Sequence, residues 1–158
     1  MGTKGHGVFN SVFVNMQPIP SKWREPVARF LTRFDALYGL DCAILYGSMA
    51  TGEHRADSDI DLVLVSGGVP SDFWQRLKAV AALYEPRVPL EALSYTSQEF
   101  DRMIEDMHVT ALDATTQGIP LTSAEVFDKF REHTAVLQSR GLRRESHAWV
   151  MDAPREQS

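Results

Sequence analysis

Two aspartates spaced two residues apart are the residues whose types and spacing most clearly suggest chemistry. Asp59 and Asp61 stand at the start of an apolar run that continues to Val65. Because successive side chains of a β-strand point to opposite faces, the two carboxylates would share one face. Side by side they would repel each other unless a cation lay between them, and oxygen ligands of this kind suit Mg²⁺ or Mn²⁺. The pair therefore predicts a divalent-metal site.

A glycine and a serine that precede the aspartates predict a phosphate-binding turn. Gly47 and Ser48 end an apolar run that begins at Cys42 and is expected to form a strand. Glycine lets backbone N–H groups approach a phosphate closely, the serine hydroxyl can donate a hydrogen bond, and a following helical turn would add partial positive charge. Mg²⁺ commonly completes its coordination with substrate phosphates, so an anion site beside a cation site predicts a nucleotide.

The spacing of these residues resembles a family signature. Gly47 and Ser48, ten residues, and then Asp59-Ile60-Asp61 are similar to the motif of the DNA polymerase beta nucleotidyltransferase superfamily, in its minimal, antitoxin-like branch. The similarity extends over roughly residues 25–122. The other positions that agree with the pattern are Ala50, Gly52, Ser58 and Leu62.

The resemblance implies a third carboxylate. In the superfamily an acid on a neighbouring strand completes the metal site and can act as general base, and Glu91 is the position here that matches. Many members carry aspartate there, and a glutamate facing solvent on an edge strand is the alternative. The implied site is Asp59, Asp61 and Glu91 as catalytic and metal-binding residues, with Gly47 and Ser48 holding the nucleotide phosphates.

The same resemblance implies a fold and a reaction. The fold would be an α/β (α+β) nucleotidyltransferase fold, a small mixed β-sheet with helices packed mainly on one side. Two Mg²⁺ ions, with Mn²⁺ as a possible replacement, would assist transfer of a nucleoside monophosphate, AMP from ATP, to a hydroxyl acceptor. His54 and Arg55, in the connection before the aspartates, could contact the triphosphate or simply form a solvated loop.

Three acceptors or roles remain open. Short members of the family are often paired with a helical HEPN-type toxin and transfer AMP to one of its tyrosines, which would make this chain an antitoxin. An aminoglycoside-type small molecule is the second possibility, and a partner-binding module without activity is the third. Three acids in one cluster argue against the third, because a simple binder has no use for such costly charges.

Composition limits the other possibilities. The chain has 158 residues, a net charge of −5 and a single cysteine, Cys42. The negative charge argues against general nucleic-acid binding, and one cysteine excludes an intramolecular disulfide. The sequence contains no apolar segment long enough to span a membrane and no signal-peptide pattern, so we expect a cytoplasmic location.

The remaining pattern predicts the elements around the site. We expect an N-terminal extension at 1–20, partly mobile, with an edge strand somewhere in 8–16, a nucleotidyltransferase domain at 21–141, and a mobile C-terminal tail at 142–158. Apolar periodicity predicts a helix over 21–38 and a second helix over 71–84 whose Phe73 and Trp74 face the sheet. Further helices are expected over 100–107 and 122–141, a third strand over 88–95, and a short edge strand near 118–121.

Overall fold

The computed structural model describes residues 13–122 and 124–152. The part of the chain before residue 13, including most of the expected edge strand, lies outside the described residues. The helices and strands of the described residues, in chain order, are α2 (Ser21–Tyr38), β1 (Cys42–Tyr46), α3 (Ser48–Thr51), β2 (Ile60–Val65), α4 (Phe73–Ala81), β3 (Leu90–Tyr95), α5 (Ser97–Glu105), α6 (Val109–Gln117), β4 (Ile119–Pro120), α7 (Ala124–Ser139), β5 (Leu142–Glu145) and β6 (Ala148–Met151).

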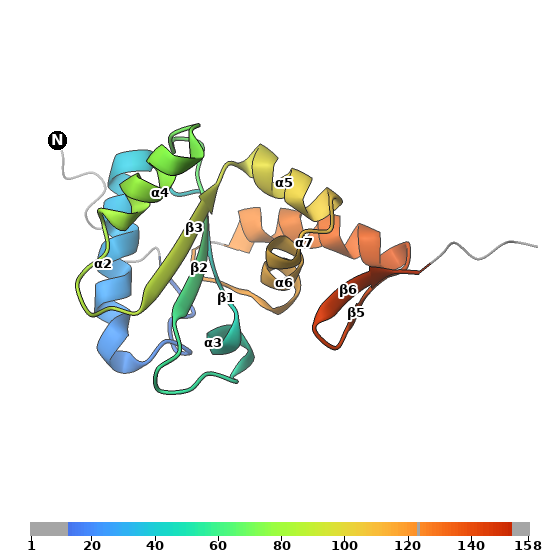
Figure 1. Ribbon diagram of the computed structural model, residues 1–158, viewed down its shortest axis with the longest axis horizontal. Helices are drawn as coiled ribbons and strands as arrows, with labels where there is room; N and C mark the ends of the chain where they lie inside the picture. The colour runs from blue at the N-terminus through green and yellow to red at the C-terminus, as the bar shows by residue number, and fades with distance from the viewer. Residues whose placement is uncertain (1–12, 123, 153–158) are drawn as a thin grey trace, which may run out of the picture.

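A four-stranded mixed sheet lies at the centre of the molecule (Figure 1). Its strand order is β3-β2-β1-β4, with β2 and β3 parallel and the other neighbours antiparallel. This arrangement confirms the α/β class with a small mixed sheet. It also confirms the expected third strand, β3, and the expected short edge strand near 118–121, the two-residue β4.

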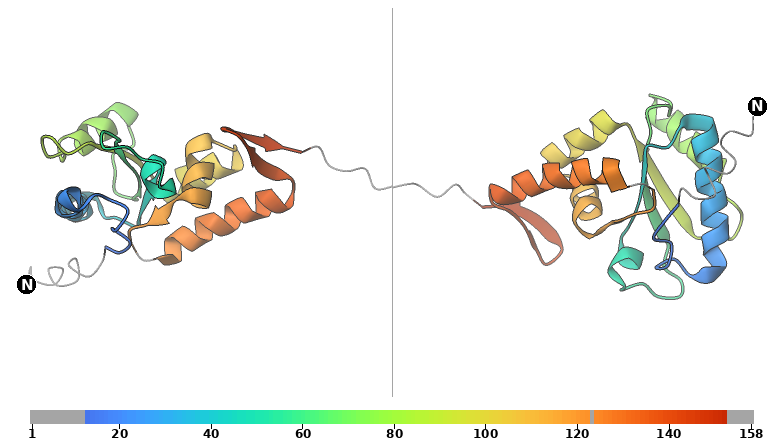
Figure 2. Two further views of the ribbon diagram at one scale, coloured as in Figure 1. Left: turned by 90° about the horizontal axis from the view of Figure 1, so that it is seen from below. Right: turned by 180° about the vertical axis from the view of Figure 1, so that it is seen from behind.

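Helices cover both faces of the sheet, where the sequence predicted mainly one. Alternate strand residues such as Leu62 and Leu64 pack with α2 and α4, while Val63 and Val65 pack with α5, α6 and α7. Figure 2 shows the two sets of helices on opposite sides of the strands. The central strands have apolar side chains on both faces, a pattern that requires cover on both sides.

The helix α4 differs from its sequence prediction at its start. It begins at Phe73 and not at residue 71, because Asp72 caps it by accepting a hydrogen bond from the Gln75 N–H at 2.9 Å. Phe73 and Trp74, which were expected to pack on the sheet, have side chains that are 55% and 69% exposed. The helix instead buries Val80 and, unexpectedly, the charged side chain of Arg76.

Side chains of α4 and the turn after it cover the outer edge of β3. Tyr84 Oη accepts a hydrogen bond from the Ala92 N–H at 2.9 Å, and Arg76 Nη1 donates to the Ser94 carbonyl at 3.2 Å. Arg76 also forms an ion pair with Glu99, at 2.7 Å, in the capping box that begins α5. The edge strand is therefore blocked against pairing with a further strand.

The sequence predicted a mobile tail from residue 142, but the described residues after this point form two strands. Strands β5 and β6 form an antiparallel hairpin after α7, with Leu142 buried and Trp149 packed against the α5–α7 core. Trp149 Nε1 donates a hydrogen bond to Asp113 of α6 at 2.8 Å. None of the helices in the described ranges combines the length and the apolar character needed to cross a membrane.

Candidate active site

Three residues on adjacent strands form a row across one face of the sheet. In the strand registers, Tyr46 of β1 is paired with Asp61 of β2, and Asp61 is paired with Glu91 of β3. Paired residues on neighbouring strands project from the same face. Here that face is the one covered further along by α5–α7, because Val63 and Tyr95 pack in that core. The pairing thus places Glu91 beside Asp61, as predicted, although Glu91 is also exposed.

Gly47 lies directly against the Asp61 carboxylate. A Cβ added at Gly47 would be 2.5 Å from Asp61 Oδ2, closer than real Cβ atoms come to another atom. The backbone of Gly47 also has φ of 73° and ψ of −158°, a region that is essentially restricted to glycine. Both conditions have one cause: the chain turns sharply out of β1 so that the next residue, Ser48, begins the short helix α3 beside the acids.

Asp61 is under electrostatic strain. Burial and then the charges of Glu91 and Asp59 raise the pKa of the Asp61 carboxyl from 3.8 to about 6. A bound cation would relieve both effects, because it neutralises the charges that disfavour ionisation. Asp61 therefore has the environment of a metal ligand in a partly buried site.

Asp59 lies just before β2, which begins at Ile60, so the expected position within the strand is off by one residue. A compact turn precedes it: Ser58 Oγ accepts a hydrogen bond from the Arg55 N–H at 2.7 Å, and the Ser58 N–H donates to the Arg55 carbonyl at 3.1 Å. The Asp59 side chain is exposed, yet its charge acts on Asp61. These hydrogen bonds close a turn between Arg55 and Ser58 directly before Asp59.

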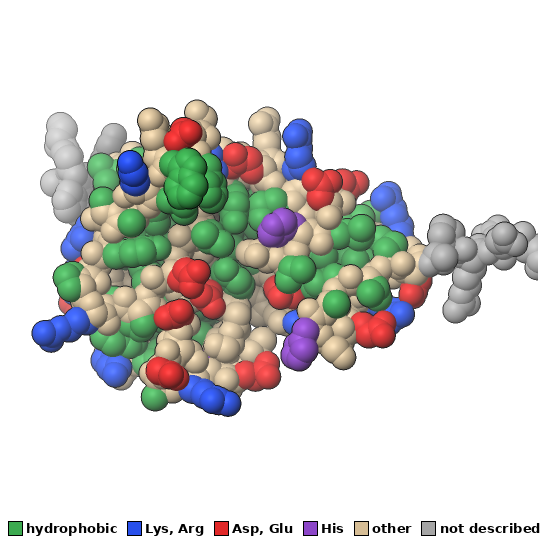
Figure 3. Space-filling model, viewed as in Figure 1, with side chains coloured by type: hydrophobic (Ala, Val, Ile, Leu, Met, Phe, Trp, Pro, Cys, Tyr) green, Lys and Arg blue, Asp and Glu red, His purple; other side chains and the backbone are tan. Residues whose placement is uncertain are grey.

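The acids of the site do not assemble a three-residue metal site by themselves. Across the described ranges, no group of three or more histidine, cysteine, aspartate or glutamate side chains is arranged so that it could hold a metal ion. Mg²⁺ does not need such a group, because it is usually bound through one or two carboxylates plus phosphates and water. The oxygen donors of Asp61 and Glu91, in register beside a glycine turn, fit such an ion. In Figure 3 acidic side chains gather over the lower ends of β2 and β3.

Tyr46 and Asp113 are residues near the site that the sequence did not suggest. Burial, and then the charges of neighbours that include Asp61, Glu91 and Asp113, raise the pKa of the Tyr46 phenol above its ordinary value. Asp113, on α6, accepts hydrogen bonds from Trp149 and from Arg144 of the hairpin. The sequence could have indicated Tyr46, because this residue immediately precedes Gly47. No local pattern marks Asp113.

The fold and this constellation define a class of protein. A mixed sheet with a Gly-Ser turn after β1 and carboxylates on β2 and β3 is a nucleotidyltransferase fold. Residues 33–102 match the family described as "Polymerase beta, Nucleotidyltransferase". This stretch contains the turn and all three acids.

Solved structures of other proteins are similar to the chain only at low sequence identity. The crystal structure of a toxin-antitoxin with AMP-PNP has a TM-score of 0.42 and 17% identity, over 80% of this chain and 88% of that one. A mutant of the toxin-antitoxin MntA-HpeT has a TM-score of 0.46 and 17% identity, over 73% and 85% of the two chains. No curated protein sequence matches the chain.

Proposed function

We propose that this chain is a Mg²⁺-dependent nucleotidyltransferase that moves a nucleoside monophosphate, AMP from ATP, to a hydroxyl acceptor. The observation that carries the proposal is the pairing of Asp61 with Glu91 beside Gly47. It places carboxylates from two strands next to a turn that only glycine can form. The family match over residues 33–102 supports the same reaction class.

Each site residue has a role in the proposal. Asp59, Asp61 and Glu91 would hold the divalent ions, two Mg²⁺ or their Mn²⁺ equivalents, and Glu91 is also the candidate base for the acceptor hydroxyl. When bound, the metal supplies neutralisation of the triphosphate charge and activation of the acceptor. Gly47 and Ser48 would orient the β and γ phosphates, which leave as pyrophosphate when the acceptor oxygen bonds to the α phosphorus. Positioning and electrostatics then account for the rate, since phosphoryl-type transfers require little covalent chemistry from the protein.

We further propose a protein acceptor, a tyrosine of a HEPN-type toxin, for which the chain would act as antitoxin. Asp59 and Glu91 are exposed, so the carboxylate row is open to a macromolecule. The implication of a toxin partner comes from the resemblance to the minimal nucleotidyltransferase branch. An open site fits this acceptor better than it fits a small molecule, which is usually enclosed by its pocket.

The test uses the purified chain, labelled ATP, Mg²⁺ and the product of a neighbouring gene that encodes a helical protein with an Arg-x-x-x-x-His motif. We expect label on a tyrosine of that product. The label should disappear with the double variant Asp59→Asn and Asp61→Asn. Label that persists in this variant would contradict the site, and label found only on aminoglycosides would favour the small-molecule alternative.

A further inference from the structure

The phenol of Tyr46 belongs to the carboxylate row but has no role in the reaction proposed above. Tyr46 is paired with Asp61 in the strand register and directly precedes the Gly47 turn. Its ring is partly buried and packs against the α5–α7 core. Burial and neighbouring charges act on its hydroxyl, which forms no hydrogen bond with another residue in the described part of the chain. The site therefore contains a hydrogen-bond donor that the fold itself does not use.

Asp113 is the acid of α6 whose charge reaches this phenol. Its side chain is 23% exposed. Trp149 Nε1 and Arg144 Nε, both from the hairpin, donate to the same carboxylate oxygen, Oδ1, at 2.8 and 3.3 Å. Among the residues that the structure describes, none donates to Oδ2. The hairpin thus fixes the carboxylate through one oxygen and leaves the other as an acceptor.

Both of these unused atoms are open to solvent. In residues 13–122 and 124–152, the side-chain atom that is sealed from solvent and lacks a partner is Ser94 Oγ. Tyr46 Oη and Asp113 Oδ2 are therefore not sealed, although both residues are only partly exposed. A ligand can reach them without a rearrangement of the core.

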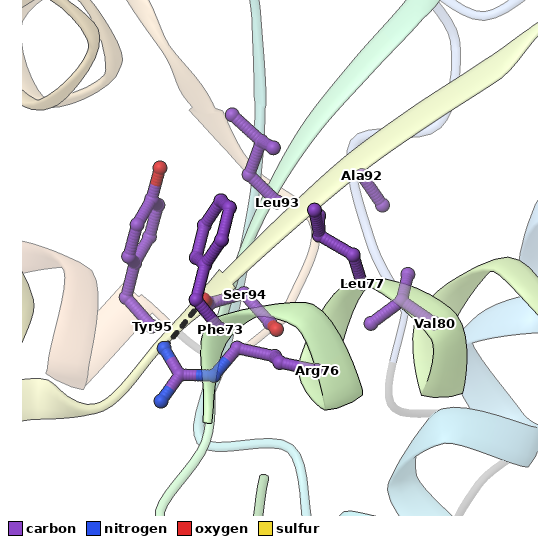
Figure 4. Close-up of a pocket in the computed structure, with 8 residues that line it drawn as sticks. All are labelled: Phe73, Arg76, Leu77, Val80, Ala92, Leu93, Ser94 and Tyr95. Atoms are coloured by element: carbon purple, nitrogen blue, oxygen red, sulfur yellow. Dashed lines mark hydrogen bonds between the residues drawn. The ribbon is translucent and has the colours of Figure 1, made fainter. Parts of the chain in front are cut away.

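The enclosed hollow of the molecule is not part of this site. It has a volume of about 230 Å³, and its walls come from α4 and from residues 92–95 of β3. Figure 4 shows Leu93 and Tyr95 projecting from one side of β3 and Ala92 from the other. Glu91 shares the side of Leu93, because residues two apart on a strand share a face. A nucleotide held by Asp61 and Glu91 therefore lies outside this hollow, on the face that carries Tyr46.

The two free atoms differ in chemistry and together fit a sugar hydroxyl. Burial and the neighbouring acids keep the pKa of Tyr46 above its ordinary value, so the phenol stays protonated and can donate. The Asp113 carboxylate accepts hydrogen bonds and repels phosphate. A hydroxyl both donates and accepts, and carboxylates bind ribose hydroxyls in other nucleotide sites. The uncharged part of a nucleotide next to its α phosphate is the ribose.

We propose that Tyr46 and Asp113 form the ribose subsite of the nucleotide. Asp113 Oδ2 accepts a hydrogen bond from a ribose hydroxyl, and Tyr46 Oη donates to a ribose oxygen. The strand that carries Tyr46 is adjacent to that of Asp61, about 4.8 Å away, so the subsite adjoins the metal ligand that holds the phosphates. This inference rests on the proposed function and adds a substrate class to it, ribonucleotides in preference to deoxyribonucleotides.

The experiment measures binding of ATP, 2′-deoxy-ATP and 3′-deoxy-ATP to the full chain by calorimetry in the presence of Mg²⁺. We expect the wild type to bind ATP about tenfold more tightly than at least one of the deoxy forms, because a partly buried carboxylate loses its donor when the hydroxyl is missing. Asp113→Ala should weaken ATP binding and reduce the preference to within about twofold. Tyr46→Phe keeps the ring and should weaken ATP binding several-fold.

The preference separates a ribose contact from a structural role of Asp113. A loosened hairpin would weaken the binding of all three nucleotides equally, whereas loss of the contact removes the difference between them. The matched control Asp128→Ala, at an exposed acid of α7, should keep the wild-type preference.

Two outcomes would overturn the inference and leave the proposed function in place. One is equal binding of ATP and both deoxy forms by the wild type, and the other is a preference that survives in Asp113→Ala. Absence of Mg²⁺-dependent binding for all three nucleotides would overturn the proposed function together with the subsite.

Discussion

Gly47 shows how one residue links the turn to the chemistry. A Cβ at position 47 would push the Asp61 carboxylate away, and the backbone of Gly47 adopts a conformation that other residues avoid. We predict that Gly47→Ala lowers the free energy of unfolding by about 2 to 3 kcal/mol. It should also abolish Mg²⁺-dependent ATP binding measured by calorimetry.

Gly52 provides the matched control for this change. It also has a positive φ, 81°, but a Cβ added there meets no atom within 4 Å. Gly52→Ala should therefore cost only the backbone strain, roughly 1 kcal/mol, and should leave nucleotide binding in place. Equal losses of binding in the two variants would show that the contact with Asp61 does not matter.

The raised pKa of Asp61 predicts a pH-dependent stability. The folded-state pKa, about 6, exceeds the ordinary value of 3.8, so the folded protein holds this proton more tightly than the unfolded chain. The resulting destabilisation is absent below pH 3.8, grows as the pH rises towards 6, and is complete above 6. Asp61→Asn should therefore raise the Tm at pH 7.5 and have little effect at pH 3.5.

The same variant tests whether Asp61 binds Mg²⁺. Added Mg²⁺ should raise the Tm of the wild type at pH 7.5, because the ion binds the folded state. It should not raise the Tm of Asp61→Asn. An equal rise in both proteins would place the ion elsewhere.

At the scale of the elements, a histidine joins two helices. His133 of α7 contacts Asp101 of α5 through Nδ1 at 3.2 Å and Glu105 through Nε2 at 2.9 Å. Burial lowers the pKa of His133, but the two hydrogen bonds and the charges of these acids outweigh it, and the net pKa is raised above 6.5. The contact therefore stabilises the protein below pH 6.5, and this stabilisation is lost as the pH rises through the folded-state pKa.

We predict that His133→Gln lowers the Tm at pH 5.5 and that the difference from wild type shrinks by pH 8.5. Glutamine keeps a polar side chain of similar length but cannot carry the charge. Thermal unfolding followed by circular dichroism at several pH values measures the effect. A difference that is constant with pH would assign the role to packing instead of charge.

At the scale of the whole molecule, the C-terminal hairpin extends the α5–α7 side of the sheet. Trp149 and Arg144 both donate to Asp113, and the charge of Asp113 acts on Tyr46 at the site. The hairpin is thus connected to the carboxylate row through α6. In Figure 1 it lies beyond α6, at the end of the molecule opposite α2.

Trp149→Phe should loosen the hairpin without changing the sheet. The variant removes the indole N–H that Asp113 accepts at 2.8 Å and keeps an aromatic ring, so we expect a loss of about 1 to 2 kcal/mol. Hydrogen exchange should become faster in residues 142–151 and remain unchanged in 60–65. Faster exchange across β2 as well would mean that the hairpin and the sheet open together.

The sequence by itself determined the parts that depend on neighbouring residues. Strand alternation and the apolar runs around Gly47 and Asp61 predicted two strands with a tight turn, and the ten-residue spacing indicated the family. The capping box that Thr96 and Glu99 form is equally local, because a cap involves only one turn of helix. Such features follow from local geometry and need no knowledge of the rest of the chain.

Only the tertiary structure decided which distant residues meet. The register that sets Glu91 beside Asp61, the helices on the second face of the sheet and the contact of Asp113 with the hairpin join segments far apart in sequence. Phe73 and Trp74 were assigned to the sheet because apolar residues usually pack inside, yet the cap at Asp72 and the burial of Arg76 turn them outward. Strand register and the rotation of a helix depend on packing summed over the whole core, which no local pattern contains.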